Sequence, residues 1–341
     1  MKALTGGMTN AVFRCSKPGG DNSTVLLRSY GEGTEMFFSR ENELKVFKLL
    51  GELGFGPALL ATLEDGRVEE FLEGKSLDAE DMHRPLISDL VARQMAELHA
   101  LDIDTGDRDP LIFRTLEDFH GKAMEICGNV FGGVDVVELG RMVAKLRERL
   151  EEGVSSKTVF CHNDLQSGNI MYKGKPSISA TSDDTMGEAA APNGDATAPS
   201  PRRTSDHLVS LIDYEYSGYN PRGFDIGNHF CEWTADYAAE ESHVVDLERY
   251  PSVEERRRYC RTYLGTANGV PDDEVAAEEV EGLVSEADAY SLASHLLWAT
   301  WSLLQSKSET AAAGFDYIKY AAERIRAYRH FSGTFLPPPA K

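Results

Sequence analysis

The sequence predicts an α+β protein with two lobes, a small β-rich N-terminal lobe and a larger, mainly helical C-terminal lobe. A chain of 341 residues can bury a full core, and two lobes that share a cleft are a common arrangement at this length. Strand-like patterns surround one helical pattern in residues 1–75, whereas helical patterns dominate residues 76–341. We therefore place the boundary between the lobes at residue 75.

The N-terminal lobe is expected to hold strands around a single helix. Residues 11–15 (AVFRC) and 24–30 (TVLLRSY) are rich in β-branched and aromatic side chains, as strands are. Residues 39–53 (SRENELKVFKLLGEL) repeat apolar side chains at helical spacing. Residues 58–72 predict a hairpin that turns at the Asp-Gly pair of positions 65 and 66.

The C-terminal lobe is predicted from four helical patterns. They cover residues 89–101, 137–152, 279–307 and 316–331. Residues 177–207 interrupt the lobe with a stretch rich in Ser, Ala, Thr, Asp, Gly and Pro and poor in large apolar side chains. Because such a composition cannot bury enough surface to fold, we predict a disordered insertion there.

Composition argues against several classes of partner. Lys and Arg number 35 against 56 for Asp and Glu, so the formal charge is −21, which disfavours nucleic acid and anionic membrane surfaces. The five cysteines are far apart and lack metal-binding spacing, as is typical of reduced thiols in the cytosol. The first residues lack a signal-peptide pattern, and no apolar run is long enough to span a bilayer. We expect a cytoplasmic protein without stable membrane insertion.

The clearest sign of chemistry is the stretch VFCHNDLQSGNIMY, residues 159–172. Asn169 follows Asp164 at a distance of five positions, the spacing of the kinase catalytic loop, in which the Asp orients the attacking hydroxyl and the Asn holds magnesium. A polar turn whose Asp and Asn cap local backbone would explain the same residues. His162 is expected to be structural, orienting the Asp without taking a proton.

A second acidic residue favours the catalytic loop over the polar turn. Asp213 ends an apolar strand-like run, as the magnesium-binding Asp of kinases does. It stands 44 positions after Asn169, and without the 31 residues of the insertion the separation is 13, which fits one hairpin. We therefore predict that Asn169 and Asp213 bind Mg²⁺ together. Asp225, a little further on, is expected to bond the backbone of the catalytic loop.

The N-terminal lobe should then supply the contacts to the nucleotide. Gly7 and Asn10 lie in a Gly-rich turn that enters a strand, where backbone N–H groups could reach phosphate oxygens. Arg28 ends a strand-like run, and Glu43 on the next helical pattern is expected to contact it and hold it in place. This is the order of the basic and acidic residues that hold the ATP phosphates in kinases. Each residue alone would be an ordinary surface charge or turn, and the order of the set favours the nucleotide site.

The segment that joins the two lobes is expected to bind adenine. In VEEFLEG, residues 68–74, the backbone of Glu70 and Leu72 could hydrogen-bond the base. Residues 1–75 are thus predicted to form a nucleotide-binding lobe.

Three stretches of the sequence together resemble the choline/ethanolamine kinase family. They are residues 162–170 (HNDLQSGNI), 211–233 (LIDYEYSGYNPRGFDIGNHFCEW) and 296–307 (LLWATWSLLQSK), and the similarity extends from about Leu4 to about Phe331. The resemblance implies a protein-kinase-like fold, a cytosolic homodimer, and Mg²⁺-dependent transfer of the ATP γ-phosphate to choline or ethanolamine as the first step of phosphatidylcholine or phosphatidylethanolamine synthesis.

The resemblance also assigns roles to residues. It places the base, the catalytic acid and the metal ligands on Arg28, Asp164, Asn169 and Asp213, and Glu215 matches as well. Gln166 and the stretch NHFCEW are more similar to choline kinases than to ethanolamine kinases. We therefore expect ATP, Mg²⁺ and choline as ligands, with Gln166 beside the substrate.

A cage of aromatic rings is expected around the cationic head of the substrate. Trp298 and Trp301 are three positions apart on one side of a helical pattern, and a trimethylammonium group, which cannot donate hydrogen bonds, is attracted to such ring faces. Ordinary core packing would also explain two tryptophans in so apolar a helix. Glu232 is a possible acceptor for a primary ammonium. The other rings expected in the cage are those of Tyr216, Tyr237, Phe315 and Tyr320.

Other functions stay open at this point. An ethanolamine kinase or a dual-specificity enzyme would use the same fold and the same catalytic residues. A catalytically inactive scaffold is disfavoured, because inactive kinase-like proteins generally lose one of the residues Asp164, Asn169 and Asp213. An aminoglycoside kinase would need acidic pockets to bind the several amines of its substrate, whereas this sequence has a helix rich in indole rings.

Overall fold

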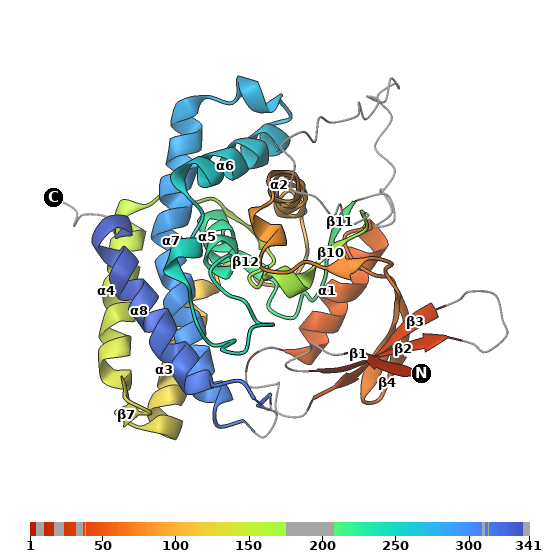
Figure 1. The fold of residues 1–341 in the computed structure, drawn as a ribbon, viewed down its shortest axis with the longest axis horizontal. Helices are drawn as coiled ribbons and strands as arrows, with labels where there is room; N and C mark the ends of the chain where they lie inside the picture. Colours follow the sequence, from red (N-terminus) through yellow and green to blue (C-terminus); the bar gives the residue numbers. More distant parts are fainter. Residues whose placement is uncertain are drawn as a thin grey trace.

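The computed structural model describes residues 1–4, 10–16, 24–31, 37, 39–174, 208–308, 311–312 and 314–336. Within these ranges the chain forms the two lobes expected from the sequence, with the β-rich lobe on the right and the helical lobe on the left of Figure 1. The insertion predicted at residues 177–207 lies outside the described residues, as does Gly7.

The N-terminal lobe is built on a five-stranded antiparallel sheet in the order β1-β2-β3-β5-β4. Its strands are β1 (Lys2–Leu4), β2 (Asn10–Ser16), β3 (Thr24–Tyr30), β4 (Leu59–Leu63) and β5 (Gly66–Glu70). Helix α1 (Arg40–Leu53) begins at Ser39, whose hydroxyl caps the N–H of Asn42, and ends at Gly54 in the left-handed conformation. The strands, the helix and the hairpin predicted here are confirmed.

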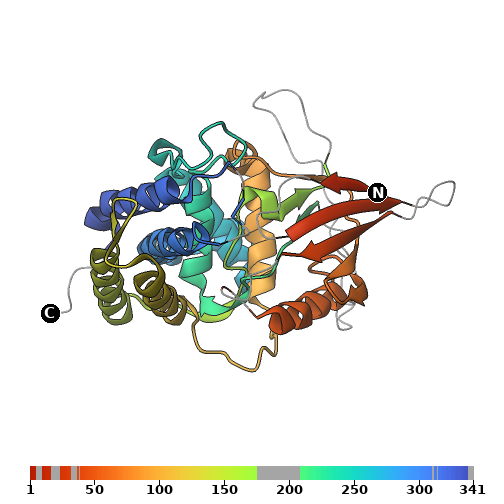
Figure 2. The same ribbon diagram turned by 90° about the horizontal axis from the view of Figure 1, so that it is seen from below.

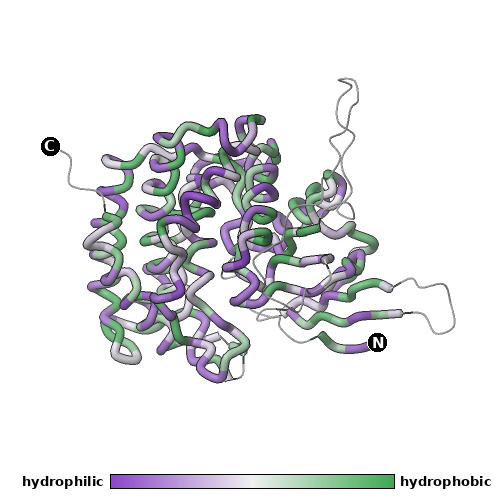
Figure 3. The backbone as a smooth tube through the Cα atoms, turned by 45° about the horizontal axis from the view of Figure 1, so that its top comes forward, coloured by the Kyte–Doolittle hydropathy of each residue, from purple (hydrophilic) through white to green (hydrophobic). Residues whose placement is uncertain are grey.

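Helices make up most of the C-terminal lobe. They are α2 (Pro85–His99), α3 (Ile112–Cys127), α4 (Val136–Gly153), α5 (Arg222–Glu232), α6 (Val253–Asn268), α7 (Ala277–Gln305) and α8 (Tyr317–Phe335). All four helical patterns found in the sequence correspond to helices, whereas α3, α5 and α6 were not predicted. In Figure 3 hydrophobic and hydrophilic stretches alternate along most of these helices, as amphipathic packing requires.

Helix α7 is the central element of this lobe. Figure 2 shows it enclosed by neighbouring helices, and it packs against α3, α5 and α8. From Glu286 to Gln305 every residue of α7 is buried, because partners cover the helix on all sides. Within the described ranges, no helix has the length and apolar character needed to cross a membrane.

Helix α5 lies unusually close to α7. A Cβ atom on Gly227 would come within 2.3 Å of the carbonyl oxygen of Ala287 and 2.8 Å of the amide nitrogen of Ser291. A side chain on Gly223 would likewise collide with Glu286. The two glycines therefore permit a close approach between the helices, which fixes where α5 presents its polar side chains.

Short strands carry the loops of the site. Strand β9 (Thr158–Cys161) pairs with β12 (Gly218–Pro221), and β10 (Ile170–Tyr172) pairs antiparallel with β11 (Val209–Leu211) in the hairpin that the sequence predicted. Strand β6 (Lys75–Ser76) adds to the β10 edge. The lobe boundary at residue 75 falls within β6 and stays a prediction.

Candidate active site

The loop after β9 is held in place by one carboxylate of α5. Asp225 accepts hydrogen bonds from the backbone N–H of His162 at 2.8 Å and of Asn163 at 2.7 Å. Asn163 has a positive φ of 67°, and its side chain bonds the backbone of Tyr216 and Gly218. The predicted role of Asp225 is confirmed, and the loop receives its shape from helix packing.

Asp225 has a further partner in His99 of α2. The imidazole Nε2 donates to Asp225 at 2.9 Å, and Nδ1 lies 2.8 Å from the hydroxyl of Tyr263. Burial favours the neutral acid, but the hydrogen bond and charge of His99 outweigh it and hold the pKa of Asp225 below its usual range. The carboxylate is therefore stable as an anion inside the lobe.

Asp164 is half-buried at the centre of the site. Asn169 donates from Nδ2 to the carbonyl oxygen and to Oδ2 of Asp164 at 2.8 and 3.0 Å, while His162 Nδ1 accepts from its N–H at 3.3 Å. Burial raises the pKa of Asp164 well above its usual range, and the charges of Glu232, Glu215 and nearby Asp213 add to the effect. A carboxyl group poised in this way is suited to accept a proton from a hydroxyl group. The structural role predicted for His162 agrees with its contacts.

Asn169 and Asp213 flank Asp164, as the sequence predicted. The β10–β11 register pairs Ile170 with Leu211, so the two side chains emerge at the same end of the hairpin. Asp213 adopts a positive φ of 68°, and its Oδ1 is buried without a hydrogen-bond partner among the described residues. Since Asn169 donates its amide N–H groups to Asp164, its amide oxygen is the atom left to bind a cation. A hard cation such as Mg²⁺, which prefers oxygen ligands, fits this donor set.

Arg28 reaches the site from strand β3, but its partner differs from the predicted one. Its Nε donates to Glu69 at 2.7 Å, and its Nη1 donates to Asp213 at 3.3 Å. The predicted contact between Arg28 and Glu43 is wrong, because Glu43 accepts from Arg67 at 2.6 Å instead. In the antiparallel sheet Arg28 lies opposite Arg67, so the carboxylate of Glu69 lies between two guanidinium groups.

A line of alternating charges therefore crosses the N-terminal lobe and ends at Asp213, the predicted metal ligand. All its members except Arg40 and Asp213 are less than 10 % exposed, so water screens the contacts weakly. The line consists of Arg40, Glu43, Arg67, Glu69, Arg28 and Asp213.

The other described residues predicted to contact the nucleotide are Asn10, Glu70 and Leu72, and the structure shows contacts of their own within the protein. Asn10 is buried at the start of β2 and donates to Glu215 at 3.5 Å, which brings the N-terminal lobe against the metal-binding segment. The N–H of Glu70 donates to the carbonyl of Ala58 at 2.9 Å, so a nucleotide contact would use its carbonyl oxygen. Leu72 is buried two residues after the end of β5. These placements leave the adenine contacts as predictions.

Two tryptophans and a tyrosine form one group of rings beside Asp164. Trp298 and Trp301 of α7 lie 5.5 Å apart edge to face, and Tyr216 contacts Trp298 in the same way at 5.5 Å. Trp301 donates its indole N–H to the hydroxyl of Tyr216 at 3.0 Å, and Trp298 donates to Asn228 at 2.8 Å. The polar edges of both indoles are satisfied, so a cationic or apolar group could contact them only through the ring faces, which are at present largely buried against other rings.

A second group of rings surrounds Glu232. Tyr237 donates from its hydroxyl to Glu232 at 2.7 Å and lies 3.0 Å from the hydroxyl of Tyr320. Phe315 packs against both tyrosine rings, at 6.4 Å from Tyr237 and 5.3 Å from Tyr320. The carboxylate of Glu232 also accepts from Arg324 at 3.0 Å. The structure thus brings together the rings that the sequence predicted, in two groups.

The remaining predicted substrate residue, Gln166, lies in the catalytic loop. Its side-chain oxygen caps the short 3-10 turn Ser167–Asn169 by accepting from the N–H of Gly168 at 3.2 Å. The side chain is half-buried two residues after Asp164. Its contact with substrate stays a prediction.

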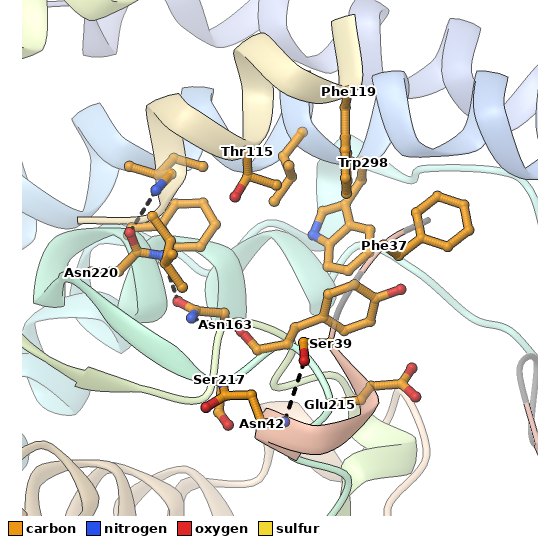
Figure 4. Close-up of a pocket in the computed structure, with 15 residues that line it drawn as sticks. Phe37, Ser39, Asn42, Thr115, Phe119, Asn163, Glu215, Ser217, Asn220 and Trp298 are labelled. Atoms are coloured by element: carbon orange, nitrogen blue, oxygen red, sulfur yellow. Dashed lines mark hydrogen bonds between the residues drawn. The ribbon is translucent and has the colours of Figure 1, made fainter. Parts of the chain in front are cut away.

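A cavity of about 210 Å³ lies beside the first group of rings. Tyr216 and Trp298 form part of its wall together with Glu215, whereas Asp164 and Glu232 do not line it. Figure 4 shows Phe37, Phe119 and Trp298 on one side of it and Asn163 and Asn220 on the other.

Some residues of the site escaped the sequence analysis. Arg67 and Glu69 stand two apart in GRVEE, and this spacing places both on one face of β5. Tyr317, which packs 5.8 Å from Trp301 and 4.8 Å from Phe315, joins the two groups of rings. Arg324 offered no signal, since a lone arginine in an amphipathic helix is normally a surface residue.

Comparison with known proteins agrees with this geometry. The family model described as choline/ethanolamine kinase matches residues 1–329. The chain is 35 % identical to the probable choline kinase 3 of Arabidopsis thaliana over 96 % of this chain and 85 % of that protein. It is 32 % identical to the choline/ethanolamine kinase of Rattus norvegicus over 98 % of this chain and 82 % of that protein.

The fold has a solved counterpart as well. The crystal structure of a choline kinase from Cryptosporidium parvum superposes with a TM-score of 0.76 and 24 % identity, covering 97 % of this chain and 88 % of that one. Fold, catalytic loop and sequence similarity over nearly the whole length agree, and the chain belongs to the choline/ethanolamine kinase family.

Proposed function

We propose that this protein is an ATP-dependent choline kinase that transfers the γ-phosphate of ATP to the hydroxyl of choline and gives phosphocholine. The observation that carries the proposal is the position of Asp164 between two kinds of surroundings. Asp164 lies near Asn169 and near Asp213, whose Oδ1 is buried without a hydrogen-bond partner among the described residues. It also lies near Tyr216 of the first group of rings and near Glu232, which the second group surrounds. A phosphate donor and a cationic alcohol would meet at this carboxyl group.

In this proposal the residues around Asp164 have separate parts in the reaction. Asp164 orients the choline hydroxyl and takes its proton as the new O–P bond forms and the bond between the γ-phosphorus and the bridging oxygen of ADP breaks. Asn169 and Asp213 would hold Mg²⁺, which when bound neutralises charge on the phosphates. Arg28, fixed by Glu69, adds positive charge on the side of the N-terminal lobe.

The aromatic rings support choline as the alcohol. A trimethylammonium group offers methyl surfaces that spread the charge and donate no hydrogen bonds, so ring faces bind it better than single acceptors do. Trp298, Trp301 and Tyr216 present such faces, and the hydroxyl and indole groups at their edges already bond one another or Asn228.

Ethanolamine, alone or together with choline, is the second candidate substrate. Glu232 favours it, because a buried carboxylate within the second group of rings could accept a hydrogen bond from a primary ammonium. An inactive scaffold is disfavoured, since Asp164, Asn169 and Asp213 are all present, Asn169 bonds Asp164, and the hairpin register brings Asp213 to the same end as Asn169.

A coupled assay of ADP release with choline, ethanolamine and an aminoglycoside tests the proposal. We expect Mg²⁺-dependent turnover with the highest kcat/KM for choline, and none without an acceptor. A higher kcat/KM for ethanolamine would instead assign the enzyme to that substrate. Absence of turnover with both amino alcohols would contradict the proposal as a whole.

We also propose a cytoplasmic homodimer that supplies phosphocholine for phosphatidylcholine synthesis. Support for self-association comes from β4, the edge strand of the sheet, where Leu60 and Leu63 are 52 % and 49 % exposed. Exposed apolar side chains on an unpaired edge are typical of a surface that another chain covers. Light scattering coupled to size-exclusion chromatography measures the mass, and a monomer at micromolar concentration would contradict this assembly.

A further inference from the structure

Arg324 of α8 is a buried charge next to the group of rings around Glu232. Its side chain is 0 % exposed, and removing a guanidinium group from water costs several kcal/mol unless its donors are satisfied. Its Nη2 donates to Glu232 at 3.0 Å and to Ser294 at 3.3 Å, and its guanidinium carbon lies 5.4 Å from the centre of the Tyr320 ring. Nε and Nη1 have no partner within the described part of the chain. A buried arginine with two donor groups unbonded is not explained by a contribution to stability. Its presence at this position therefore needs another reason.

Glu232 explains why a cation is needed there. Its Oε1 accepts from Arg324 and its Oε2 accepts from the hydroxyl of Tyr237 at 2.7 Å, so each carboxylate oxygen already holds one donor. Among neighbouring charges, that of Glu232 raises the pKa of Asp164 most, which places it next to the reacting group. A bare carboxylate in this position would bind any ammonium strongly. With Arg324 and Tyr237 in place, its negative charge is balanced by a neighbouring cation and each of its oxygens has one acceptor position fewer to offer.

We propose that Arg324 is a specificity-determining residue that acts through Glu232 and favours quaternary over primary ammonium substrates. A primary ammonium must exchange its hydrogen bonds to water for acceptors in the site, and the two oxygens of Glu232 are already engaged. A trimethylammonium group needs no acceptor and loses little. Its methyl groups also keep the nitrogen further from any carboxylate. A weaker charge on Glu232 therefore reduces the binding of a trimethylammonium group less than the binding of a primary ammonium. This inference rests on the proposed function and concerns only the choice between its two alcohols.

Two substitutions free the two oxygens separately. Arg324→Met keeps much of the volume and removes the charge and the donor to Oε1, whereas Tyr237→Phe keeps the ring and removes the donor to Oε2. Both should raise the ratio of kcat/KM for ethanolamine to that for choline, about tenfold in Arg324→Met and less in Tyr237→Phe, because a hydrogen bond to a charged group then becomes available. The KM for ATP should stay unchanged.

Controls separate this effect from packing. Tyr320→Phe removes a hydroxyl that contacts Tyr237 and leaves both donors of Glu232 in place, so it should change both alcohols alike. Arg324→Lys keeps the charge and should keep the ratio near that of the parent. If the ratio stays within twofold of the parent in Arg324→Met and in Tyr237→Phe, the inference is overturned, and if Arg324→Met does not fold, Tyr237→Phe decides alone. A parent enzyme inactive on choline would instead overturn the proposed function.

Discussion

Arg28 and Glu69 form the contact that positions the basic residue of the nucleotide lobe, with 2.7 Å between Nε and Oε1. The side chains belong to neighbouring antiparallel strands, β3 and β5, and both are almost fully buried. Because the other end of the guanidinium group donates to Asp213, the contact also sets the position of Arg28 relative to the metal ligand. Removal of the Glu69 carboxylate should therefore weaken the binding of ATP more than the binding of the alcohol.

Glu69→Gln is expected to raise the KM for ATP about tenfold with little change in the KM for choline, since it unpairs a buried guanidinium group. Initial-rate kinetics with each substrate varied in turn measure both constants. Glu43→Gln is the matched control, because Glu43 contacts Arg67 and Arg40 and does not contact Arg28. An equal rise of the KM for ATP in the two variants would show that the whole line of charges acts as a unit.

Asp164→Asn should lower turnover by about 10²- to 10⁴-fold while ATP still binds, because the change removes the proton acceptor and leaves the metal ligands. Near-normal turnover would remove Asp164 from its assigned role.

The same substitution should make the protein more stable at neutral pH. The raised pKa of Asp164 means that the folded protein keeps a proton that the unfolded chain releases, so stability falls as pH rises from the usual carboxyl range through the raised value. The amide has no such cost. We expect Asp164→Asn to have the higher melting temperature at pH 8, with the difference shrinking below about pH 4.

Glu232→Gln should shift the pH dependence of kcat/KM for choline. In the parent, activity should fall on the acidic side at a pH above the usual carboxyl range, as Asp164 becomes protonated. Loss of the Glu232 charge lowers the pKa of Asp164, so this fall should move to lower pH. Glu281→Gln changes a carboxylate that pairs with Arg257 at the surface, and it should leave the profile in place. An unmoved profile in Glu232→Gln would mean that another group titrates.

Trp301→Ala should raise the KM for choline at least tenfold and that for ethanolamine less, with little effect on the KM for ATP, because cation–π attraction is worth about 2 kcal/mol in a desolvated cage. Trp301→Phe keeps a ring face and should fall between the parent and Trp301→Ala. Equal losses for both alcohols would assign Trp301 to packing, and a loss confined to ATP would contradict the cage.

Gly227→Ala is expected to destabilise the protein by about 3 kcal/mol or more, since the new Cβ would collide with the backbone of α7. Turnover should fall as well, because Asp225, two residues earlier, holds the catalytic loop. Gly282→Ala, on α7 itself, meets nothing within 4 Å and should stabilise the helix by about 0.5 kcal/mol. Urea unfolding followed by circular dichroism measures both, and similar stabilities for the two variants would contradict the close packing of α5 and α7.

Local patterns were sufficient for most elements and for the order of the catalytic residues. The spacing of Asp164 and Asn169, and the return of the chain at Asp213, predicted that these residues lie together, and the hairpin register brings Asn169 and Asp213 to one end of the hairpin. Helix α5 was missed because glycines at 223 and 227 lower helix propensity, and their reason for being there is a partner helix more than 50 residues later in the chain.

Partners across a sheet were harder to predict than the elements themselves. Glu43 and Glu69 are both acidic residues that follow Arg28 in the sequence, and only the register of β3 and β5 shows which one it contacts. The buried position of Arg324 likewise depends on how α8 packs against α5 and α7, which the periodicity of a single helix does not reveal.

The β10–β11 hairpin has a consequence for how this enzyme can change through evolution. Asn169 and Asp213 leave one end of the hairpin, and the residues between the strands leave the other, so the ladder of three paired residues sets the separation of the two metal ligands. Insertions and deletions beyond Tyr172 and before Val209 can accumulate without retuning the catalytic centre, at a cost that grows only slowly with length. We therefore expect a reporter domain inserted between Tyr172 and Val209 to leave turnover near that of the parent.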